Sequence, residues 1–217
     1  MSIFKNIIFD LDGTLTDPGV GITRSVSYAL NKFGISEKTE NLYKFIGPPL
    51  RDSFTKYYGF SREKAEEAVL YYREYFSETG IFENEVYPGI PALLSELKKS
   101  GRNLYLATTK PIIYAEKILH HFDLHRYFTS TAGSNLDGSN GEKSVLIAGL
   151  IKGYGITEFT RAVMVGDRKY DIEGARANGI ASVGVAYGYA GEGELEESMP
   201  DYIAETVTDL KKFLLNS

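Results

Sequence analysis

The sequence predicts an α/β fold: a parallel sheet core interrupted by an inserted block of helices. Two observations support this prediction. Between residues 84 and 217, short runs rich in branched residues alternate with helical patterns, and this alternation is typical of a parallel sheet with right-handed crossovers. Between residues 18 and 83, apolar residues recur only at helical spacing. A chain of 217 residues has room for one core domain and a smaller insertion.

We therefore expect two domains. Residues 1–17 and 84–217 would form the Rossmann-like α/β core, and residues 18–83 would form a helical lid. The first strand is expected over Ile3–Phe9, a short buried run, and Ser61 is the expected N-cap of the long helix of the insertion.

The rest of the core is predicted from the alternating patterns. Apolar runs bounded by turn residues predict strands, and apolar residues at helical spacing predict helices. The expected strands are 103–109, 127–133, 161–167 and 180–188, and the expected helices are 88–101, 111–122, 142–153, 170–179 and 207–215.

Composition excludes several classes of protein. The chain is 43% hydrophobic and 24% charged, which is ordinary for a globular protein. With a net charge of −5 and no basic tract, we expect no nucleic-acid partner. No run approaches the roughly 20 apolar residues of a membrane span, and the apolar run before Asp10 is too short for a signal peptide. The absence of cysteine excludes disulfides and fits a cytoplasmic location.

Polar residues follow three of the predicted strands. Asp10 and Asp12 follow the first strand, Thr108 and Thr109 end the second, and Asp167 ends a later one. In a parallel sheet the carboxyl ends of the strands meet at one edge, where ligands bind. We therefore expect these residues to converge on a single site.

The paired aspartates allow more than one interpretation. Asp and Gly after a strand can simply form a tight turn. A calcium loop is excluded because Gly13 stands at the fourth position of the motif and not at the sixth. The remaining interpretation is a metal-dependent reaction centre, where a cation and a proton make two close carboxylates tolerable.

The stretch GDRKYD carries a second pair, Asp167 and Asp171. Asp167 could be a helix N-cap with Asp171 in the first turn, where the helix dipole favours it. Together with Asp10, however, Asp167 supplies hard oxygen ligands suited to Mg²⁺. In LYLATTKP, a hydroxyl residue at a strand end precedes a helix begun by Pro111, which offers a hydroxyl and backbone N–H groups to a phosphate.

In order along the chain, these elements resemble the haloacid dehalogenase superfamily of phosphohydrolases. The stretch DLDGTLTD resembles its first motif, ATT its second, Lys143 its third, and GDRKYD its fourth. The insertion after the first motif is similar to the helical cap of the family, so the resemblance covers nearly the whole chain. FIGPPLRDSF and TTKP resemble the phosphoglycolate phosphatase and pyrophosphatase-like enzymes.

The resemblance implies a role for each aspartate. Asp10 would be the nucleophile that becomes an aspartyl-phosphate, and Asp12 the general acid and base. Mg²⁺ would be bound by Asp10, the Asp12 backbone carbonyl and Asp167, while Asp171 would support the metal site from behind. Because a dehalogenase lacks the second aspartate and an ion-pumping ATPase has threonine there, Asp12 favours phosphate-ester chemistry.

The resemblance also implies the phosphate-binding groups. Thr108, Thr109 and Lys143 would bind the phosphoryl oxygens. Many relatives carry a Lys-Pro pair at the third motif, whereas Ser144 follows Lys143 here, and Lys110 is therefore a competing cation.

In the cap, Arg51 would read the substrate, although an exposed arginine at a helix start is an equal alternative. Six aromatic residues near Arg51 could stack on a nucleobase or simply pack the cap. They are Tyr43, Phe45, Phe54, Tyr57, Tyr58 and Phe60.

The function implied is a Mg²⁺-dependent phosphatase for small phosphomonoesters such as phosphoglycolate or a nucleoside monophosphate. The expected partner is a small phosphorylated metabolite, and the expected state is a monomer or homodimer. A phosphomutase of the β-phosphoglucomutase type and a non-catalytic binding module are the alternatives.

Overall fold

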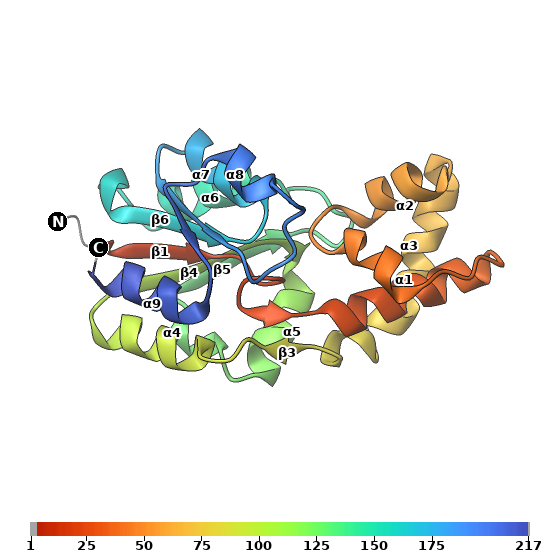
Figure 1. Ribbon diagram of the computed structural model, residues 1–217, viewed down its shortest axis with the longest axis horizontal. Coiled ribbons are helices and arrows are strands. Elements are labelled where there is room, and N and C mark those ends of the chain that lie inside the picture. The colour runs from red at the N-terminus through yellow and green to blue at the C-terminus, as the bar shows by residue number, and fades with distance from the viewer. Residues whose placement is uncertain (1–3, 217) are drawn as a thin grey trace. The chain divides into compact units, whose positions relative to one another are not determined.

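The computed structural model describes residues 4–216, and the chain forms two compact units (Figure 1). One unit contains the residues up to 16 together with those from 86 onward, and the other contains residues 17–85. The domain boundaries predicted from the sequence lie after residues 17 and 83.

The first unit is built on a six-stranded sheet in the order β5-β4-β1-β6-β7-β8, and all neighbouring strands are parallel. The predicted parallel sheet is therefore confirmed. Ile3, predicted to begin the first strand, lies outside the described residues, and β8 was not predicted. The strands are β1 Asn6–Phe9, β4 Asn103–Pro111, β5 Ser130–Ser134, β6 Ala162–Gly166, β7 Ala181–Val185 and β8 Tyr202–Ala204.

Helices cover both faces of this sheet (Figure 1). α6 and α7 lie on one face, and α4, α5 and α9 on the other. The short helix α8 was not predicted, because its five residues are too few for a helical pattern. The helices are α4 Ile90–Lys99, α5 Ile112–His121, α6 Lys143–Gly153, α7 Lys169–Ala177, α8 Glu194–Ser198 and α9 Val207–Asn216, with 3-10 turns η3 His125–Tyr127 and η4 Phe159–Arg161.

β1 lies at the centre of the sheet, and all four of its residues are buried. Ile8 packs with Met164 of β6 and Ile147 of α6 in the core on one face. Its register places Phe9 beside Leu106 and Val165, so the residue after β1 leaves the sheet between two other strand ends. A buried central strand thus gives Asp10 a rigid base.

The inserted unit is mainly helical, as the apolar spacing predicted. Ser61 is the N-cap of α3, since its hydroxyl accepts a hydrogen bond from the Lys64 N–H at 3.3 Å. Phe45, Phe54 and Phe60 are buried, so these aromatic residues pack the unit. The helices are α1 Gly19–Lys32, η1 Thr39–Phe45, α2 Leu50–Tyr58, α3 Arg62–Phe76 and η2 Gly80–Phe82, and two short strands, β2 Thr16–Asp17 and β3 Glu85–Val86, pair separately.

Between residues 4 and 216, none of the helices has the length and apolar character needed to span a membrane.

Candidate active site

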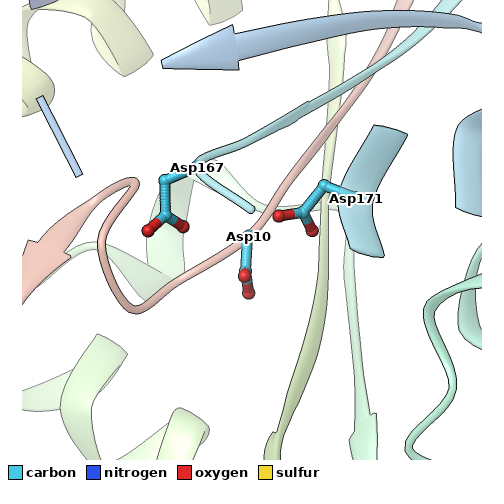
Figure 2. Close-up of side chains that lie close together, drawn as sticks. All are labelled: Asp10, Asp167 and Asp171. Atoms are coloured by element: carbon cyan, nitrogen blue, oxygen red, sulfur yellow. The ribbon is translucent and has the colours of Figure 1, made fainter. Parts of the chain in front are cut away.

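Three buried carboxylates meet at the carboxyl edge of the sheet (Figure 2). Asp10 follows β1, Asp167 follows β6, and Asp171 lies in the first turn of α7. One oxygen from each lies within 4.8 Å of the others, and their exposed fractions are 7%, 1% and 0%. We call these three residues the acidic triad.

Lys143, the first residue of α6, lies inside this cluster and is 5% exposed. Its Nζ lies 2.8 Å from Asp10 Oδ2 and 2.7 Å from Asp171 Oδ1. It also donates to the Ala107 carbonyl at 2.8 Å. Three oxygens thus surround the ammonium, although Asp171 Oδ1 meets it as an ion pair and has no hydrogen-bond partner among the described residues. Lys143 therefore ties two aspartates of the triad to β4.

Lys110 forms a second buried ion pair, with Asp12. Lys110 Nζ lies 2.6 Å from Asp12 Oδ2, while Asp12 Oδ1 is buried with no hydrogen-bond partner among the described residues. The pairing of β4 with β5 is irregular between Thr108 and Pro111, and such a bulge re-aims side chains. The two candidate lysines thus both lie at the site, each on a different aspartate.

Asp167 is oriented by two donors that are distant in the sequence. Its Oδ1 accepts from the Thr14 hydroxyl at 3.2 Å, and its Oδ2 accepts from the Tyr189 N–H at 2.8 Å. The interpretation of Asp167 as a helix N-cap is therefore wrong. Arg168 occupies that position, and its N–H donates to Asp171 Oδ2 at 3.1 Å, which leaves Asp167 facing the cluster.

Glycines bring the backbone close to the triad. A Cβ at Gly13 or Gly188 would overlap Asp167, and one at Gly166 would overlap Asp171. The sequence reasoning did not identify Gly188 or Tyr189 as part of the site. The available signal was the glycine-rich run AYGYAGEG, residues 186–193. The predicted strand 180–188 extended into this run, whereas the observed strand β7 ends at Val185, so the run follows a strand end as the other site residues do.

Burial changes the protonation of these groups. Burial, reinforced by Asp171 and Asp10, raises the pKa of Asp167 well above its ordinary value. Burial also raises the pKa of Asp171 to about 6 despite the opposing charge of Lys143. Burial lowers the pKa of Lys143, but the neighbouring Asp10 and Asp171 outweigh it, so the net shift is upward. The fully ionised triad is thus costly without a further cation.

The donor set fits a divalent metal ion. Three carboxylates face a single ammonium, so full ionisation leaves two negative charges uncompensated. Carboxylate and carbonyl oxygens are the ligands that Mg²⁺ prefers, and the buried glycine contacts leave the ligands little freedom to move. The residues of the site therefore fit a divalent metal ion.

The remaining predicted residues are placed as follows. Thr108 is 1% exposed, and its hydroxyl accepts from the Lys110 N–H at 3.3 Å, while Thr109 is half-buried. Arg51 belongs to the inserted unit, in α2, where its Nε lies 3.5 Å from Glu66 Oε1 of α3. Its side chain is 43% exposed at the start of α2, so both interpretations of Arg51 stay predictions.

Residues 7–185 match the family model of the haloacid dehalogenase-like hydrolases. A 5'-nucleotidase of Pseudomonas aeruginosa is 45% identical over 97% of this chain and 96% of its own. The tyrosine-protein kinase PtkA of Mycobacterium tuberculosis is 38% identical over 96% of this chain and 72% of its own. A phosphoglycolate phosphatase of Aquifex aeolicus is 29% identical over 97% of this chain and 96% of its own. A predicted phosphatase from Clostridium acetobutylicum, of known crystal structure, superposes with a TM-score of 0.94 at 46% identity, over 100% of both chains.

Proposed function

The chain belongs to the haloacid dehalogenase-like hydrolase family, and we propose that it is a Mg²⁺-dependent phosphatase of small phosphate monoesters that works through an aspartyl-phosphate. The observation that carries the proposal is the buried carboxylate of Asp10, held between Lys143 and the other two aspartates of the triad. A carboxylate fixed in this way can attack phosphorus without first being ordered.

Asp10 is the nucleophile. Its Oδ1 accepts from the Leu11 N–H at 2.7 Å, and its Oδ2 pairs with Lys143, so both oxygens are oriented. The carboxylate is the form that attacks phosphorus, and the positively charged Lys143 Nζ lies 2.8 Å from its Oδ2. Attack forms the bond between the carboxylate oxygen and phosphorus, and the bond from phosphorus to the ester oxygen breaks.

Asp12 moves the protons. Burial raises the pKa of Asp12 above its ordinary value, although Lys110 opposes the rise, and this direction favours the protonated form that a general acid needs. In its acid form Asp12 protonates the leaving ester oxygen. The resulting carboxylate then takes a proton from the water that cleaves the aspartyl-phosphate, which returns Asp12 to its acid form.

Asp10, the Asp12 backbone carbonyl and Asp167 would hold Mg²⁺. The ion supplies positive charge that offsets the negative charge of the phosphoryl oxygens. Asp171 keeps the ligands in place from behind, because it shares Lys143 with Asp10 and anchors the Arg168 N–H.

Thr108, Thr109, Lys110 and Lys143 would serve the phosphoryl group. Lys143 already lies beside Asp10 and Asp171 and donates to the Ala107 carbonyl. We therefore assign Lys143 first to the orientation of Asp10, and we assign the phosphate contact to the two lysines together.

The substrate we favour is a nucleoside monophosphate, because the 45% identical relative is named a 5'-nucleotidase, whereas the phosphoglycolate phosphatase is only 29% identical. Arg51 of the cap would contribute to this choice. Arg51→Met should reorder the preference among substrates. Arg62→Met should not, and it is a matched control because Arg62 pairs with the same Glu66 oxygen at 3.5 Å.

The relative named a tyrosine-protein kinase favours a second candidate, in which the aspartyl-phosphate passes its phosphoryl group to a tyrosine hydroxyl in place of water. The same intermediate would serve a phosphomutase, which passes the group to a sugar hydroxyl.

The test is phosphate release from nucleoside monophosphates, phosphoglycolate, pyrophosphate and sugar phosphates, with Mg²⁺ or EDTA. Wild type should release phosphate only with Mg²⁺, Asp10→Asn should be inactive, and Glu205→Gln, which alters an exposed carboxylate of the same unit, should be unchanged. Isomerised sugar phosphate without free phosphate would favour a phosphomutase. Phosphotyrosine formed on an added tyrosine peptide, with the phosphate ester as the phosphoryl donor, would favour the transfer to tyrosine. No turnover of any compound would favour a binding module.

A further inference from the structure

The segment between β7 and α8, residues 186–193, lies directly against Asp167 of the acidic triad. Its Tyr189 N–H donates to Asp167 Oδ2 at 2.8 Å. Its Tyr187 hydroxyl donates to the Thr14 carbonyl at 3.0 Å, and the Thr14 hydroxyl in turn donates to Asp167. The segment therefore holds the Asp167 carboxylate both directly and through Thr14.

The approach of this segment is close. A Cβ on Gly188 would overlap both Asp167 and the Gly13 carbonyl. The 186–193 segment is rich in glycine, so its backbone has many accessible conformations. It can hold the Tyr189 N–H against the Asp167 carboxylate only if another contact anchors it.

Glu194, the first residue of α8, provides that anchor. Its Oε1 accepts from Arg168 Nε at 2.8 Å and from the Lys169 N–H at 3.0 Å. Its Oε2 accepts from Arg168 Nη2 and from the Gly191 N–H, both at 3.1 Å. One carboxylate thus joins the start of α7 to the 186–193 segment through four hydrogen bonds.

Arg168 is the other half of the connection. It lies between Asp167 and Asp171 in the sequence, and its N–H is held by Asp171 Oδ2. Its guanidinium meets Glu194 in a two-point contact, with exposed side-chain fractions of 14% and 15%. Such bidentate pairs are geometrically specific, unlike a surface ion pair.

We propose that Arg168 and Glu194 are a positioning pair that sets the metal affinity of the site: they clamp the 186–193 segment so that the Tyr189 N–H and the Thr14 hydroxyl fix Asp167 for Mg²⁺. This inference rests on the metal site of the proposed function. Loss of groups that orient metal ligands typically weakens metal binding about 10–100-fold.

The test measures Mg²⁺ binding by calorimetry and by the rise in unfolding temperature, alongside the Mg²⁺ dependence of phosphate release. Glu194→Ala should weaken Mg²⁺ binding about 10–100-fold, and saturating Mg²⁺ should restore most of kcat. Glu194→Gln keeps the side-chain shape and should lose less Mg²⁺ affinity than Glu194→Ala. This second variant keeps the test decisive if Glu194→Ala fails to fold. Glu196→Ala, on an exposed residue of the same helix, should bind Mg²⁺ like wild type.

A double-mutant cycle shows whether the two residues act as one unit. If they do, Arg168→Ala combined with Glu194→Ala should lose little more Mg²⁺ affinity than either change alone. Wild-type affinity in Glu194→Ala, or a kcat that stays low at saturating Mg²⁺, would overturn the proposal and leave the phosphatase assignment intact. If wild type binds no Mg²⁺, the metal site of the proposed function fails as well.

Discussion

Lys143 and Asp171 form an ion pair of 2.7 Å in which the side chains are only 3% and 0% exposed. The same ammonium lies 2.8 Å from Asp10. The contact depends on close packing of α6 on α7, since a Cβ on Gly174 would approach Lys143 Cβ to 2.8 Å. One buried cation thus links Asp10 to the first turn of α7.

Lys143→Met should reduce both activity and stability. It removes the only ammonium that pairs with Asp10 and Asp171 among the described residues, and loss of one partner of a buried ion pair costs about 3–5 kcal/mol. Loss of an electrostatic group of this kind lowers kcat about 10²–10³-fold. Urea unfolding and phosphate release measure the two effects.

Lys152→Met is the matched control, because Lys152 lies on the same helix and is exposed. Unchanged activity and stability in Lys143→Met would contradict the role given to this residue.

Lys110→Met should move the pH profile of kcat/KM. Lys110 lowers the pKa of Asp12 against the effect of burial, so its removal lets that pKa rise further. The limb of the pH profile that depends on the ionisation of Asp12 should therefore shift to higher pH. Lys117→Met, on the exposed face of α5, should leave the profile in place. A loss of rate with no shift would indicate that Lys110 contacts only the phosphate.

Mg²⁺ should stabilise the protein more at pH 8 than at pH 5.5. The folded-state pKa of Asp171 is about 6, and that of Asp167 is also raised, while the ordinary value is 3.8. In the metal-free protein, ionisation of these groups opposes folding above about pH 6, and the penalty disappears as pH falls through that value towards 4.

A metal ion binds the ionised carboxylates, so it relieves this penalty only where they are ionised. Unfolding temperatures with Mg²⁺ and with EDTA, taken at both pH values, give the comparison. An equal Mg²⁺ shift at the two pH values would show that the triad carboxylates do not titrate with metal binding.

Gly188→Ala should abolish most Mg²⁺ binding and activity. Its new methyl group would overlap Asp167 and the Gly13 carbonyl, so the carboxylate must turn or the 186–193 segment must retreat. Gly149→Ala is the control, since a Cβ there meets no atom within 4 Å and alanine stabilises a helix by about 0.5–1 kcal/mol relative to glycine. Calorimetry with Mg²⁺ separates the two variants, and normal binding in Gly188→Ala would contradict the geometry.

Much of the architecture follows from local patterns in the sequence. The branched run before Asp10 and the alternation of strands and helices predicted the parallel sheet, because each pattern reflects burial of a single element. The parallel topology then brought Asp10, Thr108 and Asp167 to one edge, since the ends of parallel strands must meet there. The elements that were not predicted include α8 and β8, which are five and three residues long, and the two-residue strands β2 and β3, all too short to show a period.

The pairing within the site depended on the tertiary structure. Lys143 pairs with Asp10 and Asp171, whereas Lys110 pairs with Asp12. Side-chain packing between residues up to 133 positions apart decides these pairings, and no local pattern in the sequence encodes them. The same holds for the Tyr189 N–H and the Glu194 carboxylate. A backbone donor carries no residue-type signal, and a glutamate at a helix start is ordinary until the fold places Arg168 beside it.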